Sequence, residues 1–121
     1  MKYELSQTFY FDAAHTLRRQ IEAEGSRRIH GHTYHSEITL AGVPDPTTGM
    51  VIDLGEVRRE IQLLREQLDH HFLDEVPGLG PATLENLAAF IFQKISQVFP
   101  QLVQVTVQRQ SMGDRCSIRC D

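Results

Sequence analysis

Residues 30–40 read HGHTYHSEITL and have the clearest strand pattern in the sequence. Its apolar side chains recur at every second position, at Tyr34, Ile38 and Leu40, with polar side chains between them. Because successive side chains of a β-strand project to opposite faces, the alternation predicts a strand with one face in a hydrophobic core. The first and third residues, both histidines, share the parity of the apolar side chains. Both rings are therefore expected on the core face.

Similar alternation predicts three more strands around this stretch. Residues 3–11 alternate, and so do residues 102–109, where the apolar positions 103, 105 and 107 are all valine. A turn at residues 112–114 leads to a last strand at residues 116–120. A turn-rich segment at residues 44–49 ends the strand that begins at residue 30.

Two amphipathic helices are predicted between the second and third strands. The first follows the expected N-cap Asp53 and carries apolar residues spaced three and four apart: Leu54, Val57, Ile61, Leu64 and Leu68. The second follows the expected cap Thr83, ends before Pro100, and has this apolar stripe: Leu84, Leu87, Ala88, Ile91, Ile95 and Val98. The order β-β-α-α-β-β predicts the α+β class, an antiparallel four-stranded sheet with two helices on one face. With 121 residues, the chain is expected to form a single domain, residues 1–121.

Composition excludes several classes of function. The net charge is −4 and no basic run exceeds two residues, which argues against nucleic acid as a partner. No stretch approaches the roughly 18 apolar residues that span a bilayer, and the N-terminus lacks the apolar segment of a signal peptide. A cytoplasmic protein is therefore expected. Cys116 and Cys120 would lie roughly 13 Å apart on one strand, so both are expected as free thiols.

Three histidines point to a metal. His30 and His32 project from one side of their strand, and His15 shares the parity of the core face if the first strand continues through residue 14. Adjacent strands can then bring the three rings together. Three histidine nitrogens with one open position are typical of catalytic zinc. By itself the His-Gly-His pair is equally compatible with two hydrogen-bonded histidines, and His15 favours the metal.

A second candidate pair follows the first helix. Asp69 precedes His70, and a carboxylate beside an imidazole is a common general acid-base arrangement because it fixes the ring tautomer and stabilises the cation. The alternative is that a histidine at a helix C-terminus complements the helix dipole.

Five motifs together resemble the 6-pyruvoyltetrahydropterin synthase / 6-carboxytetrahydropterin synthase family, over roughly residues 5–109. They read FDAAH at 11–15, HGHTY at 30–34, GMVIDL at 49–54, LDHHFL at 68–73 and TLEN at 83–86. The resemblance implies a tunnelling fold, in which the strands join into a trimeric barrel. It also implies that two trimers stack as a homohexamer with active sites between subunits.

The resemblance further implies a function. His15, His30 and His32 would bind zinc, and the protein would be a zinc-dependent lyase acting on the side chain of a 7,8-dihydroneopterin (triphosphate)-type substrate. Asp69 and His70 would serve the proton transfers. Triphosphate is eliminated in this family, and the carboxy-forming branch also loses a two-carbon fragment.

Two departures from the family concern the catalytic base and the pterin anchor. The family usually has a cysteine base four or six residues before His-Gly-His, where this chain has Ser26 and Glu24. A carboxylate is the more competent base, so Glu24 is favoured, as in the family branch that carries glutamate there. Both could equally be ordinary loop residues.

The anchoring glutamate is replaced by Arg109, followed by Gln110. A guanidinium only donates hydrogen bonds, so it suits an anionic substrate group or a structural ion pair with Asp114 or Glu85. A one-residue shift would give Gln110 the role. The alternative function is a paralogue that binds a non-pterin or anionic ligand without catalysis.

Overall fold

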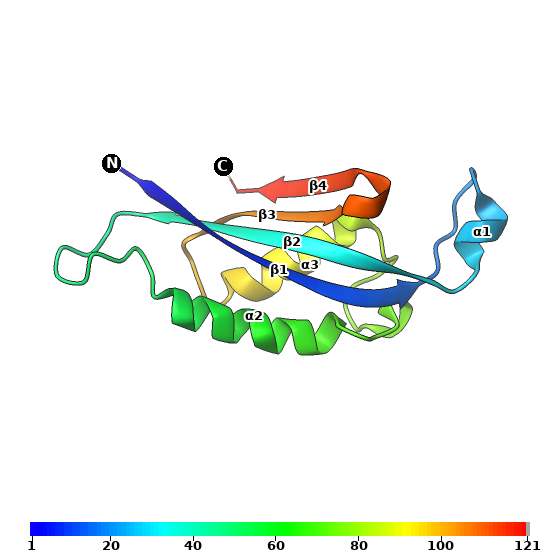
Figure 1. Cartoon of the computed structure of the whole chain (residues 1–121), viewed down its shortest axis with the longest axis horizontal. Helices are drawn as coiled ribbons and strands as arrows, with labels where there is room; N and C mark the ends of the chain where they lie inside the picture. The colour runs from blue at the N-terminus through cyan, green and yellow to red at the C-terminus, as the bar shows by residue number, and fades with distance from the viewer. Residues whose placement is uncertain (121) are drawn as a thin grey trace.

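A single four-stranded antiparallel sheet organises the computed structural model, which describes residues 1–120 (Figure 1). The strands lie in the order β1-β2-β3-β4, which is also their order along the chain. Their bounds are β1 Tyr3–His15, β2 His30–Gly42, β3 Leu102–Arg109 and β4 Asp114–Arg119. The predicted α+β class and antiparallel sheet are confirmed.

Two helices cover one face of the sheet (Figure 1). They are α2, Leu54–Leu68, and α3, Leu84–Ser96. Both predicted caps are present: Asp53 accepts a hydrogen bond from the Gly55 amide, and Thr83 accepts one from Asn86. Short 3₁₀ turns, η1 Leu73–Glu75 and η2 Gln110–Met112, precede α3 and β4. A five-residue helix, α1 Ala23–Arg27, joins β1 to β2 and was not predicted.

The hydrophobic core lies between the sheet and these two helices. Phe11 and Tyr34 come from the sheet, Leu68 from α2 and Ile91 from α3, and all are at most 1% exposed. No helix among residues 1–120 has the length and apolar content that a membrane crossing requires. Cys116 and Cys120 are free thiols, as predicted.

Three boundaries differ from the sequence-based expectation. β1 continues to His15, which satisfies the condition placed on the first strand. β4 begins at Asp114, two residues earlier than expected, because the tight turn closes at Gly113 with φ 76°. α3 ends at Ser96, so Val98 leaves the buried stripe and is 47% exposed; its expected burial was wrong.

The long β1–β2 hairpin extends beyond β3. β1 and β2 pair along their whole length, from Tyr3 opposite Gly42 to His15 opposite His30. Pairing of β2 with β3 starts only at His35. The end of the hairpin therefore projects past the rest of the sheet, and α1 lies beyond it (Figure 1).

Candidate metal centre and acid-base pair

The three predicted histidines form one cluster at the projecting end of the β1–β2 hairpin. His15 lies opposite His30 in the strand register, and Ala13 lies opposite His32. One ring nitrogen of each histidine lies within 4.8 Å of the others. The centroid of the His15 ring is 4.5 Å from that of His30 and 5.0 Å from that of His32.

Unpartnered ring nitrogens show that the cluster fits a metal. His15 is 1% exposed, and neither of its ring nitrogens has a hydrogen-bond partner among the described residues; the same holds for Nε2 of His32. A buried polar atom without a partner is costly, and coordination would remove that cost. The Nδ1 atom of His30 lies 2.7 Å from the Arg28 carbonyl oxygen, a hydrogen bond that orients the ring and leaves Nε2 free.

The surroundings of the cluster favour neutral imidazoles. Burial lowers the pKa of His15 from 6.5 to about 4, and the charges of His30 and His32 act in the same direction. Burial also lowers the pKa of His32, followed by the positive charge of Arg109. Because only a neutral imidazole has a lone pair to give, both rings are in the metal-binding form at neutral pH.

The ring of Tyr34 packs against the histidine cluster. The sequence analysis predicted Tyr34 as a core residue and gave it no place in the site. Its ring stacks on Phe11 at 5.2 Å between centroids and meets the edge of His32 at 5.6 Å. The hydroxyl is buried without a hydrogen-bond partner among residues 1–120. Burial raises the pKa of Tyr34 to about 12, so the phenol stays protonated. Tyr34 is two residues after His32 on the same strand, so their shared face could have indicated that Tyr34 lies beside the cluster.

Asp69 and His70 form the expected pair at the end of α2. Nδ1 of His70 is 3.0 Å from Oδ2 of Asp69, and the other carboxylate oxygen accepts the Asp12 backbone amide at 2.9 Å. That amide hydrogen bond is the largest cause of a lowered pKa at Asp69, which stays ionised. His70 has a left-handed backbone, φ 59°, and its amide donates to the Asp12 carbonyl at 2.7 Å. Both residues are thus hydrogen-bonded to the backbone of β1 at its outer edge.

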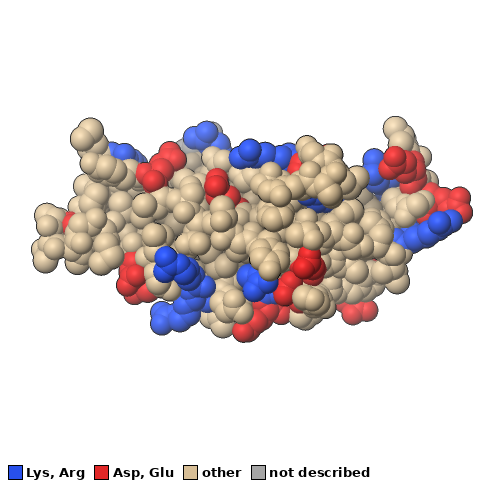
Figure 2. Space-filling view, viewed as in Figure 1, with Lys and Arg blue, Asp and Glu red and all other residues tan. Residues whose placement is uncertain are grey.

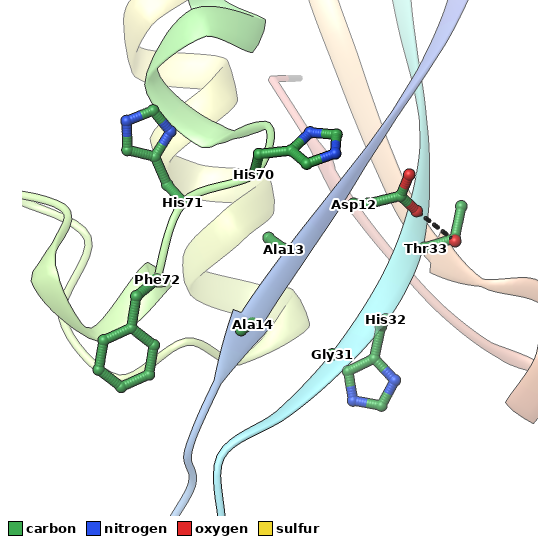
Figure 3. A pocket seen from close by; sticks show the side chains of 9 residues that line it. All are labelled: Asp12, Ala13, Ala14, Gly31, His32, Thr33, His70, His71 and Phe72. Atoms are coloured by element: carbon green, nitrogen blue, oxygen red, sulfur yellow. Dashed lines mark hydrogen bonds between the residues drawn. The ribbon is translucent and has the colours of Figure 1, made fainter.

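A cavity of about 600 Å³ lies beside β1 and β2 and is lined both by His70 of the acid-base pair and by His32 of the histidine cluster (Figure 3). His70 lines it from the end of α2, and Gly31 and Ala14 line it from the strands. In Figure 3 the ring of His32 points away from His70, with β1 between them. The His32 and His70 rings therefore lie on opposite sides of β1, although both residues line this cavity.

The two candidates for the pterin anchor lie apart. Arg109, at the end of β3, has one guanidinium nitrogen 2.6 Å from Oδ2 of Asp114, which is the ion pair weighed as its alternative role. Its Nε atom is buried and unpartnered within the described chain, and its charge acts on His15 and His32. Gln110 instead lines a separate hollow together with Tyr10 and His35, at the open face of the sheet.

The two candidates for the base belong to α1. Glu24 is exposed and pairs with Arg28 at 3.0 Å. Ser26 is buried, and its hydroxyl donates to the Ala23 carbonyl at 3.0 Å. No hydrogen bond joins either side chain to the three histidines within residues 1–120. The serine is thus engaged in holding α1 together, whereas the carboxylate faces solvent.

The fold and the three-histidine cluster define a class, that of small α+β domains with a candidate metal centre at a strand hairpin. The family model described as 6-pyruvoyl tetrahydropterin synthase matches residues 4–120. This chain therefore belongs to the 6-pyruvoyl tetrahydropterin synthase family.

Relatives and solved structures agree with that assignment. A putative 6-pyruvoyl tetrahydrobiopterin synthase of Caenorhabditis elegans is 33% identical over 114 residues, covering 81% of each chain. A 6-carboxy-5,6,7,8-tetrahydropterin synthase of Synechocystis is 35% identical over 95 residues, covering 74% of this chain and 71% of that protein.

Among solved structures, the 6-pyruvoyl tetrahydropterin synthase of Caenorhabditis elegans superposes with a TM-score of 0.86 at 26% identity, covering all of this chain and 97% of that one. The Plasmodium vivax enzyme, in a form described as a catalytic-residue mutant with glutamate replaced by alanine, gives 0.79 at 19% identity and shows the same fold. It covers all of this chain and 99% of that one.

Proposed function

We propose that this protein is a zinc-dependent lyase that acts on the side chain of a 7,8-dihydroneopterin-type substrate, with or without its triphosphate. The observation that carries the proposal is the cluster of His15, His30 and His32, whose buried nitrogens lack partners among the described residues. The names of the curated relatives, pterin synthases of the pyruvoyl and carboxy types, support the substrate class.

The histidines would hold the metal and leave one coordination position for the substrate. Bound zinc supplies Lewis acidity, which polarises a coordinated oxygen and acidifies the neighbouring C–H bond. The hydrogen bond from His30 to the Arg28 carbonyl supports this arrangement because it fixes the tautomer that presents Nε2.

Asp69 and His70 would move protons. The Asp69 carboxylate accepts the Nδ1 proton of His70, so Nε2 is left to take a proton from substrate and return it. The ring of His70 lies on the other side of β1 from the ring of His32 (Figure 3). This supports an active site made between subunits of a homohexamer, a dimer of trimers, which we also propose, in the cytoplasm.

Glu24 would be the base in place of the family's cysteine, with Ser26 as the alternative. The ion pair of Glu24 with Arg28 is exposed, and such pairs contribute little, so the carboxylate is free to change partner when substrate binds. In the Plasmodium vivax enzyme, a glutamate is likewise described as a catalytic residue. The buried hydroxyl of Ser26 already has a partner.

The test is turnover by the zinc-loaded protein with 7,8-dihydroneopterin and with its triphosphate, followed by product analysis. His30→Ala is expected to lose zinc and activity together, whereas His35→Ala, on the opposite face of β2, should keep both. The lyase function is wrong if neither substrate is consumed, or if His30→Ala matches the unsubstituted protein.

A second candidate function follows from Arg109, which we expect, with Gln110 as the alternative, to take the place of the family's anchoring glutamate. The protein would then bind an anionic or non-pterin ligand without the family's catalysis. Equilibrium binding of pterins distinguishes the lyase from a protein that binds a different ligand. Pterin binding that Arg109→Gln strengthens indicates a retuned pocket, because an amide can accept the pterin amino hydrogens and a guanidinium cannot. The Asp114→Asn variant controls for loss of the ion pair.

A further inference from the structure

The segment after α2 holds the outer edge of β1 close to the candidate metal-ligating histidines. The His70 amide donates to the Asp12 carbonyl at 2.7 Å, and the Ala14 amide donates to the His71 carbonyl at 3.2 Å. Phe72 forms an isolated parallel bridge with Ala14. Figure 3 shows His70, His71 and Phe72 following one another alongside β1. The segment therefore extends the sheet past β1 by a short backbone pairing near the end of that strand.

Asp74 continues this attachment to the first residue beyond β1. It lies in η1, and its carboxylate accepts two hydrogen bonds from Thr16, one from the backbone amide at 2.9 Å and one from the hydroxyl. The neighbouring Leu73 is fully buried, so η1 is anchored in the core. Thr16 directly follows His15, and the carboxylate therefore holds the chain at the point where it leaves the sheet.

His15 has no hydrogen bond of its own that orients the ring. Nδ1 of His30 lies 2.7 Å from the Arg28 carbonyl oxygen, whereas neither ring nitrogen of His15 has a partner among the described residues. Because metal-ligating histidines are usually oriented by such a partner, His15 depends on packing and on its backbone instead. The Thr16 amide shares a planar peptide unit with the His15 carbonyl. Its hydrogen bond to Asp74 therefore fixes the peptide plane that follows the ring-bearing residue.

The charge of Asp74 also favours a cation at the cluster. Burial lowers the pKa of His15, the charge of Arg109 acts in the same direction, and the charge of Asp74 acts in the opposite one. A carboxylate that stabilises a protonated ring also stabilises a metal ion beside it, because both carry positive charge. Figure 2 shows acidic and basic side chains interspersed over one face of the molecule. Distant exposed charges are largely screened, so the groups next to the cluster set this balance.

We propose that Asp74 is a positioning residue for the metal centre. Through Thr16 it fixes the place of His15, and its charge offsets the positive charge of Arg109. This inference rests on the proposed function, because it presumes the metal that the lyase would use. Asp74 lies outside the three-histidine cluster, so its replacement should weaken metal binding and not abolish it.

The test is zinc affinity, measured on the zinc-loaded protein by competition with a chromophoric chelator and without any substrate. Asp74→Ala is expected to weaken zinc binding about tenfold or more, because it removes both hydrogen bonds to Thr16. Asp74→Asn keeps an oxygen that can accept the Thr16 amide, so it should lose less. Thr16→Val keeps the amide and removes only the hydroxyl, and it should also lose less.

Asp45→Ala is the matched control. The Asp45 carboxylate accepts the backbone amides of Thr47 at 2.7 Å and of Thr48 at 3.1 Å. This turn follows β2 at the opposite end of the hairpin from the histidines (Figure 1). Denaturant titration with chelator present should show a lower midpoint of unfolding in both alanine variants, but only Asp74→Ala should lower zinc affinity. A purely structural role of Asp74 predicts unchanged zinc affinity in both.

Zinc affinity in Asp74→Ala that equals that of the unsubstituted protein overturns the positioning role. An equal loss in Asp74→Asn and Asp74→Ala also overturns it, because the effect would then come from charge alone. Turnover of 7,8-dihydroneopterin and of its triphosphate is measured separately, at saturating zinc. Zinc binding that depends on Asp74, without turnover of either pterin, overturns the proposed lyase function instead, so the two failures are distinguishable.

Discussion

At the scale of single residues, the site is built from buried polar atoms that the protein itself does not pair. His15 shows this most clearly, because its ring is 1% exposed and lacks a hydrogen-bond partner within the described chain. An unpaired buried imidazole lowers stability on its own, which indicates a position kept for a ligand. The same burial keeps the ring neutral, and neutrality is what coordination requires.

The lowered pKa of His15 predicts how the stability of the metal-free protein depends on pH. The pKa is about 4 in the folded chain and 6.5 without the fold, so below pH 6.5 the unfolded chain binds a proton that the folded chain does not. The free energy of unfolding should therefore fall as the pH drops from 6.5 toward 4, by up to about 3 kcal/mol. Urea titrations between pH 4 and pH 6.5, with a chelator present, measure this free energy of unfolding.

His15→Gln removes the titrating group and is expected to flatten that pH dependence. Saturating zinc should restore stability in the unsubstituted protein at pH 6 and have little effect on His15→Gln, because ligand binding to the folded state adds stability. Equal pH slopes for the two chains would contradict this role of His15.

At the scale of secondary structure, the junction between α2 and β1 orients the acid-base pair. Arg65, in the last turn of α2, donates from Nε to the Tyr10 carbonyl at 2.7 Å and lies 3.4 Å from Oδ2 of Asp69. Its guanidinium also lies over the Tyr10 ring at 5.5 Å. One side chain therefore joins the helix, the free edge of β1 and the carboxylate that fixes the tautomer of His70.

Replacing Arg65 should misplace that carboxylate. Arg65→Ala is expected to lower kcat about tenfold with a smaller change in KM, because the interaction orients a proton-transfer group and does not touch substrate. Arg65→Lys should recover part of the loss, and Arg59→Ala, on the outside of the same helix, should leave kcat unchanged. Steady-state kinetics on whichever dihydropterin the protein turns over measures both parameters. A change in KM without a change in kcat in Arg65→Ala would contradict the orienting role.

The start of α2 depends on a cap. The Asp53 side chain accepts the Gly55 amide at 2.8 Å, which satisfies one of the free donors of the first turn. Asp53→Ala should lower the free energy of unfolding by about 1 kcal/mol, and Asp53→Asn, which keeps the acceptor, should lower it by much less. Denaturant titration measures both, with no change expected in zinc content. Similar losses in the two variants would mean that charge, and not capping, is the main effect.

At the scale of the whole molecule, the ring of His32 and the ring of His70 lie on opposite sides of β1. β1 and β4 are the two edge strands of the sheet, and an edge strand can pair with another chain. Between Tyr10 and Ala14 the edge of β1 already bonds to α2 and the segment after it. In a symmetric assembly, the cluster of one subunit and the pair of the next can share one cavity. The proposed homohexamer would place an active site at each such contact.

Mixing two inactive variants tests the shared site. His32→Ala keeps the acid-base pair and His70→Ala keeps the metal cluster, so mixed assemblies should regain up to about a quarter of the activity if each site uses two chains. Refolding the variants together and assaying turnover measures this. His30→Ala mixed with His32→Ala is the control and should stay inactive, because neither chain then has an intact cluster. Equal activity in the two mixtures would exclude a shared site.

Periodicity alone determined the secondary structure that positions the site. The period-two runs predicted β2 and β3, the three-four spacing predicted α2, and parity placed the three histidines on one face. These predictions succeed because side-chain direction repeats with the local backbone geometry, which neighbouring residues in the sequence already define. The segment 16–29 has no such period, so α1 was missed.

Contacts between distant residues could be read only from the folded chain. The register that sets His15 opposite His30 and the pairing of Arg109 with Asp114 both join separate segments. Whether a polar side chain meets a partner depends on packing against elements far away in the chain, and no local pattern records that. The three-histidine spacing named the candidate metal ligands, and the folded hairpin supplies the burial that leaves ring nitrogens of His15 and His32 without partners among the described residues.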